Sequence, residues 1–245
     1  MEATEILRQC TVEGNIVKLP PMQLERNDYL GVKSKLELIG GKWKGGKTQG
    51  FVFESDPSDL LAQIAGGENR NIKKESQFFE TPDDLADELV RMAEIKPTDT
   101  VLEPSAGRGA IVRAVHRQHP EINVRGFEIM DLNLSFLAKI DRFTLLGHDF
   151  LTEDCRPVDV IVANPPFAKN QDIQHINRMY SLLRSGGRLV TIASIHWQFA
   201  GGKKETAFRN WLGEIGAEVI PVASGEFKDS GTMVRTCIVK IQKAA

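Results

Sequence analysis

The feature that most constrains this 245-residue chain is an alternation of short apolar runs with helix-length segments between Val101 and Val190. Such an alternation is typical of βαβ units, in which parallel strands are joined by helices that cover the sheet. The sequence therefore predicts an α/β fold with a doubly wound, mostly parallel sheet. The expected strands are Thr100–Glu103, Asn123–Glu128, Phe143–Leu146, Val158–Ala163 and Arg188–Ser194, and the expected helices are Asp83–Glu94, Ala110–His119, Asn133–Ile140 and Asn177–Arg184.

The last part of the chain departs from this alternation. A helix is expected at Glu205–Ile215, and two strand-like runs follow it, Glu218–Val222 and Val234–Ile241, with only a polar turn around Lys228–Gly231 between them. Two strands that are joined without a helix pair antiparallel. We therefore expect a seven-stranded sheet that ends in an antiparallel hairpin.

Two helix boundaries are indicated by local residues. Thr81 is expected to be the N-cap of the first helix, because a hydroxyl ahead of Pro82 can accept an unpaired backbone N–H. Gly186-Gly187 is expected to end the helix that precedes the fifth strand.

Residues 1–75 are expected to form a separate small α/β module, followed by the main domain at 76–245. The polar run Gly66–Asn71 is typical of a linker. Expected elements of the module are a helix at Tyr29–Ile39, a strand at Gly50–Glu54 and a helix at Pro57–Ile64.

Within this module, Gly41–Thr48 matches the phosphate-loop pattern GxxxxGK[ST]. Such a loop binds phosphate only where a buried strand precedes it and a helix follows. Here a helical pattern comes first and the strand-like Gly50–Phe53 comes after. We interpret the segment as a glycine-rich turn whose lysines face solvent or a nucleic-acid backbone, since residues 31–50 contain five lysines and one glutamate.

Composition excludes several classes of protein. The 41% apolar and 26% charged residues are typical of a globular chain, and the net charge of −2 provides no whole-protein attraction to a polyanion. No apolar run approaches the roughly 20 residues of a membrane span, and Met1–Gln9 is too charged for a signal peptide. We therefore expect a cytoplasmic protein without a membrane partner. No feature indicates an oligomeric state.

Neither cysteines nor histidines are spaced as metal ligands. The three cysteines, Cys10, Cys155 and Cys237, form no CxxC pair, and the five histidines form no HxH or HExxH motif. We therefore expect reduced thiols and no metal site.

The first candidate ligand site is Val101–Ala110, which predicts a strand, a tight turn and a helix. Gly107 and Gly109 lack side chains, so a ligand can approach the turn closely, and Glu103 at the strand end can meet a cationic or hydroxyl-bearing group. The third glycine of a GxGxxG motif is missing, which disfavours a nicotinamide or flavin dinucleotide.

Two further acids follow the next two strands. Glu128 can accept both hydroxyls of a ribose, and Asp149 can accept from an adenine amino group with Phe150 beside the ring. Open α/β sheets bind ligands at the carboxyl ends of their strands, so three acids at successive strand ends indicate one nucleoside-like ligand.

The most specific motif is Asn164-Pro165-Pro166-Phe167, which follows an apolar strand. The prolines restrict the backbone, so the Asn164 side chain and the Pro165 carbonyl are held as acceptors. Accepting both N–H bonds of a conjugated amino group raises electron density on its nitrogen and favours attack on an electrophile. Phe167 offers a flat ring on which a base can stack.

Together, Glu103–Gly109 and Asn164–Phe167 resemble the cofactor and catalytic motifs of class I S-adenosylmethionine-dependent amino-group methyltransferases, especially the adenine-N6 DNA methyltransferases. Gln77–Pro82 is similar to the family's upstream segment, which covers the methionine end of the cofactor. The resemblance implies that Asn164, Pro165, Pro166 and Phe167 are catalytic, and that S-adenosylmethionine is bound by Phe79, Thr81, Pro82, Glu103, Ser105, Ala106, Gly107, Gly109, Glu128, Ile129, Asp149, Phe150 and Asn164.

This resemblance implies methyl transfer to adenine N6 in DNA after the base is flipped out, the reaction of restriction-modification methyltransferases, and the sequence does not indicate whether a cognate restriction enzyme exists. The N-terminal module resembles accessory regions of methyltransferases of phages and other mobile elements. Because no target-recognition domain follows the expected final hairpin, sequence readout is expected either from residues 1–78, Ala168–Gln174 or Trp197–Lys204, or to be weak.

Several alternatives share the motifs. The amino group could belong to cytosine N4, to an adenine in RNA or to a protein glutamine. A non-catalytic DNA-binding relic is the alternative from another class. Cytosine-C5 methylation is disfavoured because no Pro-Cys nucleophile is present.

Overall fold

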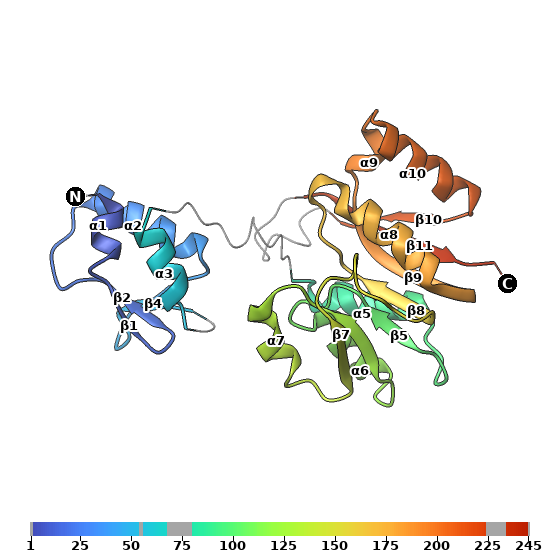
Figure 1. Cartoon of the computed structure of the whole chain (residues 1–245), viewed down its shortest axis with the longest axis horizontal. Coiled ribbons are helices and arrows are strands. Elements are labelled where there is room, and N and C mark those ends of the chain that lie inside the picture. Colours follow the sequence, from blue (N-terminus) through green and yellow to red (C-terminus); the bar gives the residue numbers. More distant parts are fainter. Residues whose placement is uncertain (1, 54–55, 68–79, 224–233, 245) are drawn as a thin grey trace. The chain divides into compact units, whose positions relative to one another are not determined.

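The computed structural model describes residues 2–53, 56–67, 80–223 and 234–244. Two compact units divide the chain, Met1–Gln77 and Phe78–Ala245 (Figure 1). Each unit has its own hydrophobic core, and each is described by itself.

The first unit packs helices against a four-stranded sheet of order β1-β2-β4-β3, in which each pair is antiparallel. Its core includes Ile6, Val17, Leu36, Phe51 and Ile64. The sequence predicted α2, β4 and α3, whereas α1, β1, β2 and β3 have three to five residues each and were not predicted. The elements are α1 Ala3–Leu7, β1 Thr11–Glu13, β2 Ile16–Lys18, α2 Arg26–Leu38, β3 Lys42–Lys44, β4 Gly50–Val52 and α3 Ser58–Ala65.

The glycine-rich turn of this unit connects two strands. β3 pairs antiparallel with β4, with Trp43 opposite Phe51 and Lys44 opposite Gly50. A strand therefore follows Gly41–Thr48 where a phosphate loop requires a helix. The first half of the segment is strand β3 and only the second half is a turn, so the interpretation of the whole segment as a turn is wrong, whereas the exclusion of a phosphate loop is supported.

The second unit is built on a seven-stranded sheet of order β10-β11-β9-β8-β5-β6-β7. The pairs β6–β7, β5–β6, β5–β8 and β8–β9 are parallel, and β11 is antiparallel to both β9 and β10. The predicted sheet and its antiparallel ending are confirmed. The strands are β5 Val101–Glu103, β6 Val124–Phe127, β7 Phe143–Gly147, β8 Val158–Ala163, β9 Leu183–Ser194, β10 Glu218–Pro221 and β11 Thr236–Gln242.

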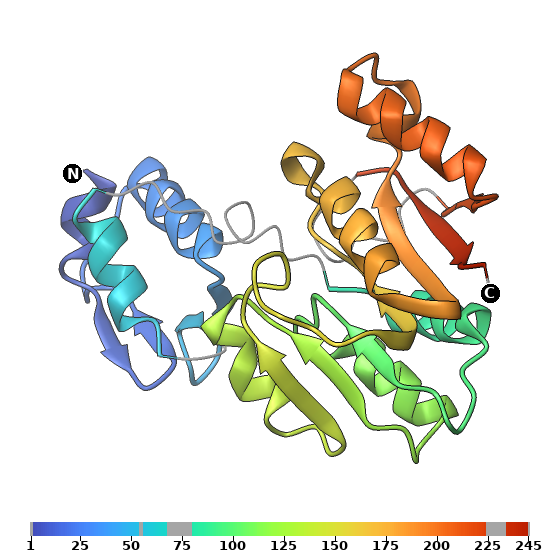
Figure 2. The same cartoon turned by 45° about the vertical axis from the view of Figure 1, so that its right-hand side comes forward.

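Helices cover both faces of this sheet (Figure 2). Successive side chains of β8 point to opposite faces of the sheet, and both faces are apolar. Val160 and Val162 pack in one apolar layer with α5 and α6, whereas Ile161 and Ala163 pack in the other with α8 and α10. The helices are α5 Asp83–Ala93, α6 Ala110–Gln118, α7 Asp131–Leu137, α8 Gln171–Leu182, α9 His196–Phe199 and α10 Lys203–Glu214, with a 3-10 turn at Ala168–Asn170. No helix within the described ranges is long and apolar enough to cross a membrane.

The boundaries of α8 differ from the prediction. The helix begins at Gln171 rather than Asn177, because the buried Asp172 carboxylate accepts from Ser194 N and Oγ at 3.0 and 2.8 Å and anchors this polar first turn. It ends at Leu182, and β9 starts at Leu183. Gly186-Gly187 therefore lies inside the strand and does not end the helix, so that prediction is wrong.

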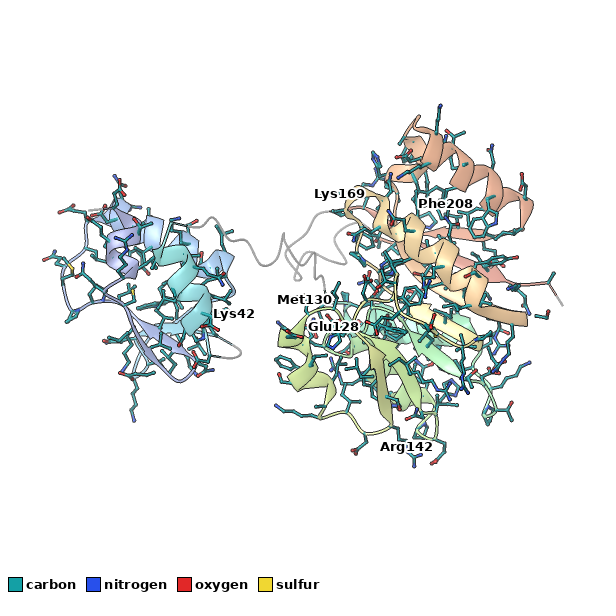
Figure 3. All side chains as sticks on the ribbon, viewed as in Figure 1. Lys42, Glu128, Met130, Arg142, Lys169 and Phe208 are labelled. Atoms are coloured by element: carbon teal, nitrogen blue, oxygen red, sulfur yellow. The ribbon has the colours of Figure 1, made fainter. Side chains whose placement is uncertain are left out.

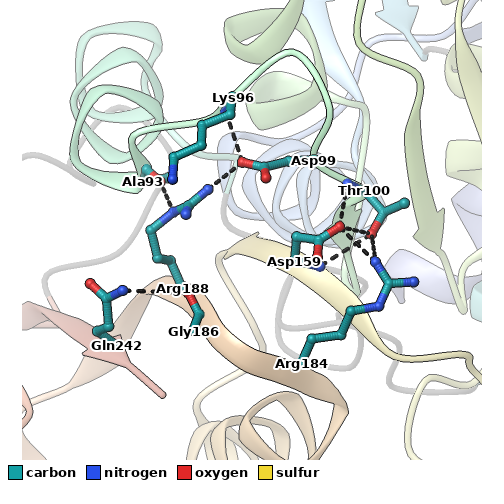
Figure 4. Close-up of polar contacts among 9 residues, drawn as sticks. All are labelled: Ala93, Lys96, Asp99, Thr100, Asp159, Arg184, Gly186, Arg188 and Gln242. Carbon is teal, nitrogen blue, oxygen red and sulfur yellow. Dashed lines mark hydrogen bonds and ion pairs between the residues drawn. The ribbon is translucent and has the colours of Figure 1, made fainter. Parts of the chain in front are cut away.

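Two arginines near the start of β9 tie it to the amino edge of the sheet, where the parallel strands begin (Figure 4). Arg188 pairs with Asp99 and donates from Nε to the Ala93 carbonyl at 2.9 Å. Arg184 pairs with Asp159 at 2.7 Å. The side chains of the first pair are 10% and 9% exposed, whereas those of the second pair are 49% and 27% exposed.

This difference in burial predicts different losses of stability. Arg188→Ala leaves the Asp99 carboxylate buried without its partner and should lower the free energy of unfolding by about 3–5 kcal/mol. Arg184→Ala breaks a more solvated pair and should cost less than about 1 kcal/mol. Urea unfolding of both variants at neutral pH checks the difference, and equal losses would contradict it.

Candidate active site

The carboxyl ends of four neighbouring strands bring the predicted residues to one edge of the sheet, called here the carboxyl edge. Glu103 is the last residue of β5, Glu128 follows β6, Asp149 comes shortly after β7, and Asn164 follows β8. Because the strands are adjacent and parallel in the order β8, β5, β6, β7, the residues along the edge follow the order Asn164, Glu103, Glu128, Asp149. Figure 3 shows Glu128 and Met130 at this edge, beside α7.

A tight turn after β5 depends on its glycines. The Ala106 N–H donates to the Phe127 carbonyl at 2.9 Å, which ties the turn to the end of β6. Gly109 has φ of +85°, and a Cβ added there would lie 2.3 Å from Ile140 Cδ1. The positive φ favours glycine at this position, and any larger residue would also have to displace the end of the Ile140 side chain.

Glu103 is a buried acid in which only one of the two carboxylate oxygens has a hydrogen-bond partner among the described residues. Its side chain is 1% exposed, and Oε1 accepts from Ser105 N at 3.0 Å. Oε2 is buried and has no hydrogen-bond partner among the described residues. Burial raises the pKa of this carboxyl to about 8, and the nearby Glu128 adds to the rise against the Ser105 hydrogen bond. The site thus fits a ligand that offers a cation or a hydrogen-bond donor.

Glu128 connects the glycine turn to the segment after β6. Its Oε2 accepts from Gly107 N at 2.6 Å and its Oε1 accepts from Met130 N at 2.7 Å. Burial raises the pKa of this carboxyl, although the backbone hydrogen bonds oppose the rise. Ile129, between Glu128 and Met130, is 67% exposed at the same edge.

Asp149 and Phe150 are placed differently from each other. Asp149 remains partly exposed, and its Oδ1 accepts from Leu151 N at 2.9 Å. Phe150 is only 2% exposed, with its ring 5.6 Å from that of Phe127 and 5.4 Å from that of His175. Phe150 therefore supports the site from the core and offers little open ring face.

His175 is a neighbour of the site that the sequence did not indicate. Its Nδ1 lies 3.5 Å from Ser105 Oγ, and its side chain is 6% exposed. Burial lowers the pKa of the imidazole to about 4, so the ring is neutral at physiological pH. The predicted helix started at Asn177, which left His175 outside any element, and no motif marks this histidine.

Asn164 is held by Thr81. The Asn164 Nδ2 donates to Thr81 Oγ1 at 3.0 Å, and Thr81 is 6% exposed. The N-cap of α5 is Pro82, without a side-chain capping bond, so the predicted capping role of Thr81 is wrong. The bond to Thr81 orients the amide of Asn164. Phe79, predicted beside this pair, lies outside the described residues.

The remaining motif residues form a packed corner. Pro165 is buried, and Pro166 and Phe167 are half-buried. Phe167 packs against the apolar layer that contains α5 and α6. The described ranges contain no group of three or more His, Cys, Asp or Glu side chains arranged to hold a metal ion.

Comparison with curated proteins finds two partial relatives, and no family model matches the chain. The chain is 32% identical over 111 residues to the type II methyltransferase M.AccI of Acinetobacter calcoaceticus, which is 43% of this chain and 20% of the relative. It is 32% identical over 100 residues to a mitochondrial ribosomal RNA small subunit methyltransferase of Arabidopsis thaliana, which is 39% of this chain and 26% of the relative. The matched segments are thus a small part of both relatives.

Solved structures extend the likeness to most of the chain. A class I S-adenosylmethionine-dependent methyltransferase structure from Listeria monocytogenes superposes with a TM-score of 0.55 at 15% identity, covering 77% of this chain and 67% of that one. The M protein of the type I restriction enzyme EcoKI superposes with a TM-score of 0.55 at 17% identity, covering 91% of this chain and 56% of that one. The chain therefore has the fold of the class I S-adenosylmethionine-dependent methyltransferases.

Proposed function

We propose that this protein transfers a methyl group from S-adenosylmethionine to N6 of adenine in DNA, as a modification enzyme of the restriction-modification type. The observation that carries the proposal is the adjacency of two motifs. Asn164–Phe167 directly follows β8, the glycine turn directly follows β5, and the two strands are hydrogen-bonded neighbours. A group held by Asn164 would therefore lie next to a ligand held by the turn.

The cofactor would be held by residues of three adjacent strand ends. S-adenosylmethionine supplies a methyl group on a positively charged sulfur. Glu103, with its buried Oε2, suits the cationic end of this ligand, and Gly107 lets it approach the turn. Glu128 suits the ribose hydroxyls and Asp149 the adenine amino group. Phe79, Thr81, Pro82, Ser105, Ala106, Gly109, Ile129, Phe150 and Asn164 complete the proposed cofactor set.

Asn164 and Pro165 would prepare the substrate amino group. Because Asn164 donates through Nδ2 to Thr81, its Oδ1 is the end that accepts from a substrate N–H. With the Pro165 carbonyl as the second acceptor, electron density on the amino nitrogen rises and its attack is favoured. Pro166 keeps this corner rigid, and Phe167 would stack on the base. The transfer would be direct: the bond between N6 and the methyl carbon forms as the bond between sulfur and that carbon breaks, S-adenosylhomocysteine leaves, and N6 loses one proton to solvent. No covalent enzyme intermediate is needed.

The similarity to M.AccI and to the EcoKI M protein, the latter from a restriction enzyme, supports DNA as the substrate. An adenine in RNA is the second candidate, and the similarity to a ribosomal RNA methyltransferase favours it over a protein substrate. Both candidates use the same residues, so the substrate must be decided by product analysis.

Asn164→Ala should reduce methyl transfer at least about 100-fold, because one of the two acceptors for the amino group is lost. Affinity for S-adenosylmethionine should fall much less than the rate of transfer, because Asn164 is only one of many proposed cofactor residues, and calorimetry measures this difference. The assay supplies labelled cofactor to DNA, RNA and a glutamine-containing protein, followed by nucleoside and peptide analysis. We expect N6-methyladenine in DNA from the wild type.

Two further variants sharpen this test. Thr81→Val removes the acceptor of the Asn164 amide and should give an intermediate loss of transfer. Asn123→Ala, an exposed asparagine at the amino edge, serves as the matched control and should retain full transfer. Label found only in RNA or protein, or full activity of Asn164→Ala, would refute the proposal.

The raised pKa of Glu103 predicts that cofactor binding depends on pH. A cationic ligand favours the ionised carboxyl, whereas the free protein keeps it protonated below a pKa of about 8. Affinity should therefore rise with pH, by up to about tenfold per unit between about pH 5.5 and 7.5, with release of a proton. This range stays below the titration of the ligand's own amino group, near pH 8.

Calorimetry in buffers of different ionisation enthalpy measures both the affinity and the released proton. Glu103→Gln cannot ionise, so its affinity should be lower at pH 7.5 and nearly constant across the range. An affinity of the wild type that does not change with pH would count against the proposed role of Glu103.

A further inference from the structure

Strand order determines the side from which a substrate reaches Asn164. The strand before Asn164, β8, has β5 on one side and β9 on the other. The acids proposed to hold the cofactor, Glu103, Glu128 and Asp149, lie at or just after the ends of β5, β6 and β7. The side left for a substrate is therefore the end of β9, where α9 and the start of α10 follow.

Phe199 is the most exposed large apolar side chain in the described part of the chain, at 77%. It lies in α9, which buries Trp197 at 4% exposure against Phe208, with ring centroids 5.1 Å apart. The Arg209 guanidinium donates to the carbonyls of Trp197 and Ala200 at 2.5 and 2.7 Å, so the backbone on both sides of Phe199 is held. An aromatic ring held outward in this way offers a flat face on which another planar ring can stack.

Exposed lysines lie in the segment that follows Phe199 and in the turn bonded to that segment. Lys203 and Lys204 begin α10 and are exposed, as is Lys169 in the turn after the Asn164 motif. The two segments lie side by side, because Asn170 Nδ2 donates to Glu205 Oε1 at 2.7 Å. Glu205 is the one acid in residues 168–171 and 196–205, and this bond engages it.

The backbone of the turn is also unusual. Lys169 and Asn170 have φ of 54° and 60°, a left-handed conformation that non-glycine residues rarely adopt. Such conformations persist where surrounding structure imposes them, and they cluster at functional sites. In Figure 3, Lys169 lies at the start of α8, on the side of the domain that carries α9 and α10.

We propose that Lys169, Phe199, Lys203 and Lys204, called here the rim, bind the DNA strand that carries the reacting base. Phe199 stacks on the face of a neighbouring base that is exposed once the reacting base is flipped out, and the three lysines contact phosphates. An aromatic ring together with cationic side chains matches the flat bases and the anionic phosphates of such a strand. Because the whole protein has a net charge of −2, attraction to DNA has to be local. The choice of DNA as the ligand of the rim rests on the proposed function.

The test measures binding of the full-length protein to a short single-stranded DNA that contains 2-aminopurine, whose fluorescence reports unstacking. Phe199→Ala should weaken binding about 5- to 100-fold, because stacking on one base is lost. Phe199→Trp should restore binding to within about twofold. Val219→Ala on β10, where Val219 is 38% exposed, is the matched apolar control and should bind like the wild type.

Salt dependence tests the lysines separately. Lys203→Ala combined with Lys204→Ala should lower the slope of log affinity against log salt by about 0.7 for each phosphate that the variant no longer neutralises. Lys96→Ala, an exposed lysine at the amino edge, should leave the slope unchanged. In all these variants the affinity for S-adenosylmethionine should equal that of the wild type.

Failure of the rim and failure of the proposed function give different results. If Phe199→Ala binds DNA like the wild type, or if a polyglutamate peptide displaces the DNA at equal charge concentration, the rim is wrong. If the wild type methylates no nucleic acid but DNA binding still depends on Phe199, the rim stands and the proposed function fails. If DNA is methylated and Phe199→Ala leaves KM for DNA unchanged, the proposed function stands and the rim fails.

Discussion

The site depends on the parallel pairing of β5 with β8 on one side and β6 on the other. This pairing sets Val101 beside both Val160 and Val124, so all three strands end at the same edge. Because the strands run in the same direction, the glycine turn after β5, Asn164 after β8 and Glu128 after β6 meet at this edge, although they are far apart in the sequence. A shift of β8 relative to β5 would separate the two motifs on which the proposed chemistry rests.

The two edges of the sheet serve different purposes. At the amino edge, Arg188 and Asp99 pair in a buried position, and Arg184 and Asp159 pair nearer the surface, so charge there is balanced and contributes to stability. At the carboxyl edge, Glu103 retains an unused buried oxygen, and this edge also carries the left-handed Lys169. Groups left in such states are typical of sites that await a ligand, and the rest of the fold offsets their energetic cost.

Hydrogen bonds to Glu128 and Thr81 show how the site is organised before any ligand binds. Glu128 accepts from Gly107 and Met130, so one carboxylate orders the turn after β5 and the segment after β6. Thr81, ahead of α5, accepts from Asn164, so the helix that packs on one face of the sheet also orients the proposed catalytic amide. Groups prepared in advance need less reorganisation when the substrate arrives.

The sequence alone determined the α/β class, most strands of the large sheet, the phosphate-loop exclusion and the strand-end motifs, because these follow from local periodicity and from the properties of glycine and proline. Tertiary structure alone decided three points. The final strand lies between β9 and β10, α8 starts at Gln171, anchored by the buried Asp172, rather than at Asn177, and Thr81 bonds Asn164 instead of capping α5. Each of these results depends on a contact between residues far apart in the chain, and such contacts leave no local pattern in the sequence.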